Sequence, residues 1–187
     1  MSFMRSQKIR LKLTKEQENR AWWYSKVSRN FWNLLVDIDK RNNRGEFDEI
    51  LNKNGNKTYH SKLHNRDIYK LNQSDYLNLA KIVVAKNSEE DSKKWSWYYQ
   101  GNQSFIYGFL SRELVKIRYQ NKGKLNFRTV DKIQPNFNVR CDVSANGKRP
   151  SRIYLKENGK LQIPTIGDLN FGSVRKGFDL SCKKQVA

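Results

Sequence analysis

One strand pattern near the start of the chain, with no second one close to it, constrains the fold most. Residues Lys8 to Leu13 alternate strictly, with Ile9, Leu11 and Leu13 on one side and basic residues on the other. This period of two is typical of a half-buried strand. Because a strand needs a hydrogen-bonding partner, we expect it to join a sheet formed much later in the chain, beyond residue 122.

The residues that follow this strand predict helices. Thr14 and Gln17 have the spacing of a capping box, in which Thr14 caps a helix and Gln17 reaches back. We expect this helix to run to about Lys40. Its apolar stripe recurs at helical spacing and is expected to be core; it consists of Trp23, Val27, Phe31, Leu34 and Ile38.

The rest of the helical region is less uniform. Arg41 to Gln73 is rich in Asn, Lys and Gly, which predicts a long loop with at most one short helix. Ser74 is expected to cap a second helix, and a third is expected to start at Ser88. A fourth is expected from Gln103 to about Tyr119, ahead of a change in composition at residues 121–124.

Beyond this change the chain has the features of a β-domain. Phe137 to Val143 alternates, and Asn146-Gly147 and Asn158-Gly159 are hairpin signals. Short strands with tight turns favour a small barrel or sandwich. We therefore predict an α+β fold in which a discontinuous β-barrel consists of residues 1–13 and 122–187, and a helical-bundle domain, residues 14–121, is inserted after its first strand.

The charge of the chain indicates an anionic partner. Lys and Arg number 37 and Asp and Glu 18, so the net charge is +19. Folding does not need this excess, whereas nucleic-acid phosphates would neutralise it. A lysine-rich surface that reflects an AT-biased genome would give the same composition. The sequence predicts no membrane span and no metal site, because His60 and His64 alone cannot complete one.

The residues most suited to nucleic-acid contact are basic ones on expected exposed faces, together with Tyr119. They are Lys8, Arg10, Lys12, Lys26, Arg29, Arg112, Lys116, Tyr119, Lys124, Arg128, Arg140, Arg149 and Arg152. On the first strand the lysines could equally protect an exposed sheet edge. Four tryptophans are candidates for base stacking, namely Trp22, Trp32, Trp95 and Trp97. For Trp22 and Trp32 a place at the flank of the core is the favoured alternative.

Three stretches of the chain, Lys8 to Gln17, Gly123 to Arg128 and Ile153 to Gly167, occur in an order and spacing that are informative together. They resemble the TnpB/OrfB proteins of insertion sequences and their relatives, the compact type V CRISPR nucleases. Lys8 to Gln17 is similar to the family's opening strand, turn and helix. Gly123 to Arg128 is similar to its G-x-P-x-F-K element, here without the proline. Ile153 to Gly167 is similar to its hairpin I-x-L-x-x-x-G-x-I-x-L-P-x-x-G. The match covers most of the chain, except residues 42–100.

The resemblance implies that the barrel is an OB-like wedge domain and the helical insert a recognition domain. In such proteins these parts hold a structured guide RNA, its heteroduplex with target DNA, and a short flanking DNA motif. The family's nuclease core would begin where this chain ends, at Ala187, so we expect no catalytic residues, no cofactor and no enzyme activity. The expected setting is the cytoplasm of a prokaryote or phage host, at the nucleoid.

Two other functions remain open from the sequence. The chain could bind, complete or inhibit a nuclease of the same family, working with a second protein chain that carries or regulates the cutting. It could also be a plain DNA-binding transcriptional regulator, although no helix-turn-helix spacing supports this.

Overall fold

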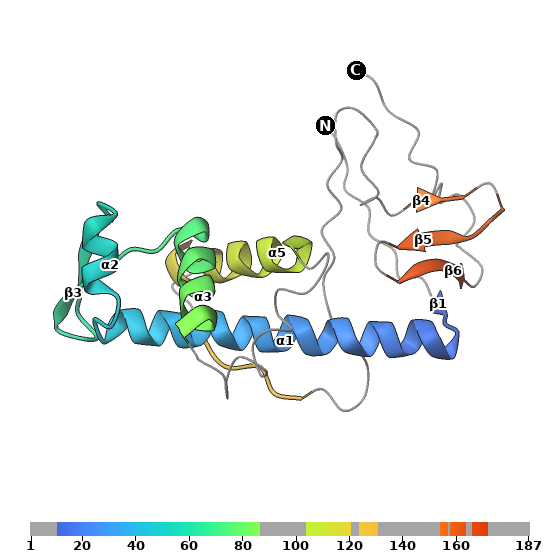
Figure 1. The fold of residues 1–187 in the computed structure, drawn as a ribbon, viewed down its shortest axis with the longest axis horizontal. Coiled ribbons are helices and arrows are strands. Elements are labelled where there is room, and N and C mark those ends of the chain that lie inside the picture. The colour runs from blue at the N-terminus through green and yellow to red at the C-terminus, as the bar shows by residue number, and fades with distance from the viewer. Residues whose placement is uncertain are drawn as a thin grey trace, which may run out of the picture. The chain divides into compact units, whose positions relative to one another are not determined.

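The structure is a computed structural model that describes residues 11–86, 104–120, 124–130, 154–156, 158–163 and 166–171. It is mixed α+β, with helices and small antiparallel sheets (Figure 1). The chain divides into two compact units. Unit 1 contains Met1–Trp23 and Val139–Ala187, and unit 2 contains Tyr24–Asn138.

The helix expected from Ser88 and the strand expected at residues 137–143 lie outside the described residues, as does the hairpin at Asn146-Gly147.

Unit 1 contains an antiparallel sheet whose strand order is β1-β6-β5-β4. The strands are β1 (Leu11–Lys12), β4 (Tyr154–Leu155), β5 (Leu161–Ile163) and β6 (Gly167–Phe171). The first strand does pair with the C-terminal sheet, through Leu11 opposite Phe171 and Lys12 opposite Asn170. The described strands form no closed barrel, because β1 and β4 are the two edges of an open sheet (Figure 1).

The capping box predicted at Thr14 is present at the start of helix α1 (Lys15–Asn43). The Thr14 amide donates to Gln17 Oε1 over 3.0 Å, and the Gln17 amide donates to Thr14 Oγ1 over 3.3 Å. The Gln17 side-chain amide also donates to the carbonyl of Asp168 on β6, over 2.7 Å. One glutamine therefore both caps α1 and ties its first turn to the sheet.

The core of unit 2 is built on α1, α3 (Gln73–Lys86) and α5 (Ser104–Val115), with α2 (Asp48–Lys53) beside them. Val27, Phe31 and Leu34 of α1 are buried in the same cluster as residues of α3 and α5. The Phe31 ring stacks on Tyr107 of α5 with centroids 4.0 Å apart. Trp23 was expected to head this stripe but is 40% exposed, because it lies a full turn before Val27, where the buried cluster begins.

A β-hairpin occupies part of the segment that was expected to be mainly loop. Strands β2 (Thr58–Ser61) and β3 (Arg66–Tyr69) pair with Tyr59 opposite Ile68, and Asn65 in the turn has a φ of 48°. The expectation failed because each short strand buries only one side chain, Ser61 or Ile68. Alternation of large apolar residues, the usual strand signal, is therefore weak here.

The cap of α3 also differs from the expectation. Asn72 Oδ1, rather than the Ser74 side chain, accepts hydrogen bonds from the amides of Ser74 and Asp75, over 2.8 and 3.1 Å. Asp75 Oδ2 accepts the Asn72 amide in return, over 2.8 Å. This reciprocal pair is a capping box with Asn and Asp in the two roles.

Replacing Asn72 with alanine is therefore expected to lower the free energy of unfolding by about 1 kcal/mol, the usual cost of losing an N-cap. The matched control is Ser74→Ala, two residues later on the exposed first turn, for which we expect a change within about 0.5 kcal/mol. Guanidinium denaturation followed by circular dichroism measures both. A larger loss for Ser74→Ala would mean that Ser74 is the cap after all.

The fourth expected helix ends in a different geometry. Helix α5 stops at Val115, and a π-helix covers Lys116–Gln120. At the ordinary α-helical period Arg112, Lys116 and Tyr119 would share one face, and the wider π turn breaks that spacing. Arg112 and Lys116 are exposed, whereas Tyr119 is half-buried.

Candidate nucleic-acid interface

A short segment that is neither helix nor strand, residues 124–130, contacts α1 in unit 2 and is called the strap here. The indole Nε1 of Trp32 donates to the carbonyl of Asn126 over 2.9 Å. The Asn33 side chain makes two hydrogen bonds to Arg128, donating to its carbonyl over 3.0 Å and accepting its amide over 2.7 Å. With Leu125 buried in the core, these contacts hold the strap in a defined position on the helix.

Helix geometry brings basic residues of α1 to the side that the strap covers. At about 100° per residue, positions 26, 29, 33 and 40 fall within about 60° of one another around the helix. Asn33, in the middle of this sector, is the residue that holds the strap. Lys26, Arg29 and Lys40 therefore share one side of α1 with the strap.

The strap adds two cations of its own, Lys124 and Arg128, both exposed. The Arg128 guanidinium lies 4.2 Å from the Trp32 ring centroid. Although the Arg128 side chain reaches solvent, the protein atoms around its guanidinium partly desolvate the charge and lower its pKa, while the charge of Glu113 opposes this effect. Lys40 Nζ lies 4.0 Å from the ring centroid of Phe127. We call this set the basic face; it consists of Lys26, Arg29, Lys40, Lys124 and Arg128.

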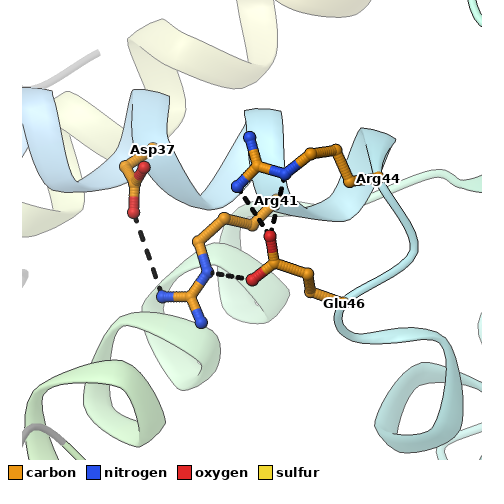
Figure 2. A network of polar contacts seen from close by, with 4 residues as sticks. All are labelled: Asp37, Arg41, Arg44 and Glu46. Carbon is orange, nitrogen blue, oxygen red and sulfur yellow. Dashed lines mark hydrogen bonds and ion pairs between the residues drawn. The ribbon is translucent and has the colours of Figure 1, made fainter.

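Arg41 and Arg44, at the end of α1, differ from the basic face because nearby carboxylates neutralise them. Figure 2 shows Glu46 between Arg41 and Arg44, with contacts of 2.7 and 2.6 Å, and Asp37 3.9 Å from Arg41. Hydrogen bonds from Arg41 and Arg44 lower the pKa of Glu46. These arginines close the turn between α1 and α2. In contrast, members of the basic face make no ion pair with any residue that the structure describes.

A buried polar network fixes the other side of α1. Asp39 Oδ1 accepts the Tyr76 hydroxyl over 2.7 Å and lies 3.3 Å from Arg118 Nε of the π-helix. That nitrogen is not aligned for a hydrogen bond, so we treat the contact as a charge pair. Arg118 also donates through Nη2 to Asn43 over 3.2 Å. The network ties α1, α3 and the π-helix together.

Two tyrosines in this network are shielded from water. Burial is the main cause that raises the pKa of Tyr76 well above its usual value, and nearby Asp39 adds to the effect. Burial likewise raises the pKa of Tyr119 to about 12. The Tyr119 hydroxyl accepts the Leu71 amide over 3.0 Å. Tyr119 was proposed as a nucleic-acid contact, but its hydroxyl is engaged inside the protein in this way.

The predicted site residues therefore separate into groups. Lys26, Arg29, Lys124 and Arg128 gather on the basic face. Lys12 is exposed on β1 of unit 1, and Arg112 and Lys116 are exposed on α5 and the π-helix. The remaining predicted residues lie outside the described residues, so their placement stays a prediction; they are Lys8, Arg10, Arg140, Arg149, Arg152, Trp95 and Trp97.

The two described tryptophans proposed for base stacking behave differently. Trp32 is only 4% exposed and belongs to the core cluster, which leaves no free ring face for a base. The prediction that Trp32 stacks on a base is therefore wrong, and the alternative, a place at the core, is the one observed. Trp22 is half-buried.

Sequence reasoning did not find two members of this site. Lys40 follows Lys26 by fourteen residues, nearly four helical turns, and this spacing could have identified it. Phe127 was noted only as part of a motif, and nothing local in the sequence predicts that it would lie against Lys40. That contact depends on the strap binding to α1.

No protein-family model, curated protein or solved structure matches this chain. None of these comparisons tests the resemblance to TnpB/OrfB proteins, which stays a prediction from the sequence. Within the described ranges, no helix has the length and apolarity to cross a membrane. The same ranges contain no cluster of three or more His, Cys, Asp or Glu suited to a metal ion.

Proposed function

We propose that this chain is a nucleic-acid-binding module and that the basic face of unit 2 contacts the phosphate backbone. The observation that carries the proposal is the grouping of five cations on one side of α1 and its strap, none of them in an ion pair with a described residue. Like charges held together repel one another, and a polyanion relieves that repulsion. Backbone contacts of this kind position a nucleic acid without reading its sequence.

We further propose that the nucleic acid is a structured RNA, alone or paired with target DNA. The support is the sequence resemblance together with the pairing of β1 with β6. This pairing joins the two ends of the chain into one β-unit interrupted by helices, which is the arrangement that the resemblance implies. The proposal assigns binding, and no phosphodiester cleavage, to the chain.

Removing cations from the basic face is expected to reduce both affinity and its dependence on salt. In the double variant Lys26→Gln/Lys124→Gln, the slope of log K against log salt should decrease by about two, about one for each phosphate that is no longer neutralised. Fluorescence anisotropy with a labelled RNA hairpin, measured over a series of salt concentrations, gives the slope. The matched control is Lys81→Gln, an exposed lysine on α3, which should leave the slope unchanged.

Two outcomes would contradict the binding proposal, and a third would overturn the non-catalytic assignment. If Lys81→Gln lowered the slope as much per charge as the double variant, the basic face would have no special role. If the chain, purified at low salt, carried no RNA of discrete length and bound no RNA hairpin, the RNA part would be wrong. Magnesium-dependent cutting by the purified chain would show that it is an enzyme.

A further inference from the structure

Phe127 stands out on the basic face because it is a large aromatic residue left in water. It is 48% exposed, although its neighbours on both sides are fixed. The Asn126 carbonyl accepts the Trp32 indole, and the Arg128 backbone is held by Asn33 at both its amide and its carbonyl. The ring is therefore presented from a backbone that is already ordered.

One cation lies against the ring, and two more belong to the same segment of chain. Lys40 Nζ lies 4.0 Å from its centroid, and Lys124 and Arg128 belong to the same short strap. A lone exposed apolar side chain needs no explanation, but an ordered aromatic ring among cations has the two parts of a single-strand binding site. These parts are a ring on which a base can stack and charges that hold the adjacent phosphates.

We infer that Phe127 stacks on an unpaired base, so that the basic face binds single-stranded segments of nucleic acid more tightly than blunt duplex. The inference rests on the proposed function and adds the kind of nucleic acid that the site selects. Stacked pairs within a duplex offer no free base face, so the ring adds affinity only where a nucleotide is unpaired. Lys40 covers one side of the ring as a cation–π partner, and the exposed area that remains is available to the base.

The test compares three variants on two probes. The variants are Phe127→Leu, which keeps the apolar bulk but lacks a π-face, Phe127→Trp, which keeps a π-face, and Val130→Ala. The last is the control, since Val130 is 60% exposed on the same strap but has no ring. The probes are a labelled single-stranded RNA of about 12 nucleotides and a blunt RNA duplex of the same length, measured by fluorescence anisotropy.

For the single strand, Phe127→Leu should weaken binding by about 5- to 100-fold, as expected for the loss of one stacked base. Its salt slope should not change, because no charge is removed. Phe127→Trp and Val130→Ala should bind as the wild type does, and the duplex should bind all four proteins equally. Thermal unfolding of each variant checks that the fold is retained.

The alternative results are distinguishable. If the wild type binds single strands and Phe127→Leu binds them equally well, the inference is wrong while the proposed function stands. The inference is also wrong if Phe127→Leu weakens single strand and duplex to the same extent. If the wild type binds neither probe, the proposed function itself fails and the inference fails with it.

Discussion

Replacing Asp39 with alanine should lower the free energy of unfolding by about 3–5 kcal/mol, the usual cost of removing one partner of a buried charge pair and leaving the other in place. The carboxylate is almost fully buried and faces both the Arg118 guanidinium and the Tyr76 hydroxyl. Without it, the largely buried Arg118 guanidinium would lose its counter-charge while keeping its hydrogen bond to Asn43, and the buried Tyr76 hydroxyl would lose the carboxylate that accepts its hydrogen bond. A buried polar group without a partner costs more than its hydrogen bond contributed.

Asp37→Ala is the matched control for this prediction. Asp37 lies two residues earlier on the same helix and faces Arg41 at 3.9 Å, with both side chains partly in water (Figure 2). An exposed pair of this kind contributes about 0–1 kcal/mol. Guanidinium denaturation followed by tryptophan fluorescence compares the two variants. Equal losses would show that the Asp39 network does not stabilise unit 2 in the way the structure indicates.

Replacing Phe31 with alanine is expected to cost a similar amount, about 3–5 kcal/mol, because it leaves a cavity in the core. Phe31 is 0% exposed and stacks on Tyr107, so its ring joins α1 to α5. In the alanine variant the buried apolar surface of the Phe31 ring is lost, and Tyr107 no longer has a ring to stack on. The strap also depends on α1, so the affinity of Phe31→Ala for RNA should fall together with its stability.

Leu63→Ala is the control for the core. Leu63 lies in the turn between β2 and β3 and is 82% exposed, so shortening it should change the free energy of unfolding by less than about 0.5 kcal/mol. Denaturant unfolding measures both variants. A cost for Phe31→Ala no larger than that of Leu63→Ala would contradict the placement of α1 in the core.

The features that could be predicted from the sequence are those that depend on neighbouring residues. The capping box of Thr14 and Gln17 lies within one turn, and the buried stripe through Val27 and Phe31 follows the helical period. The turn at Asn158-Gly159 precedes β5 as expected, and Gly159 has a φ of +73°. The pairing of β1 with the C-terminal sheet is long-range, yet it was predictable because the first strand has no local partner.

The features that escaped prediction depend on contacts between distant segments. The β2–β3 hairpin buries only Ser61 and Ile68, so its sequence has little apolar alternation to detect. The cap of α3 was predicted at Ser74 but is Asn72. Both residue types are suited to an N-cap, and the residue at which the chain turns into the helix decides which of them takes that role. The closed barrel was an extrapolation from short strands, and the described strands form an open sheet instead.

The sequence by itself determined the large positive charge, the start of α1 and the need for the first strand to pair at long range. These follow from composition and from spacings within a few residues. Only the tertiary structure decided which cations act together. The strap reaches α1 through Trp32 and Asn33, residues more than ninety positions away in the chain, and that contact brings Phe127 against Lys40 and Arg128 against Trp32. Local spacing contains no information about such a contact, since the contact exists only when the core that joins the strap to α1 has formed.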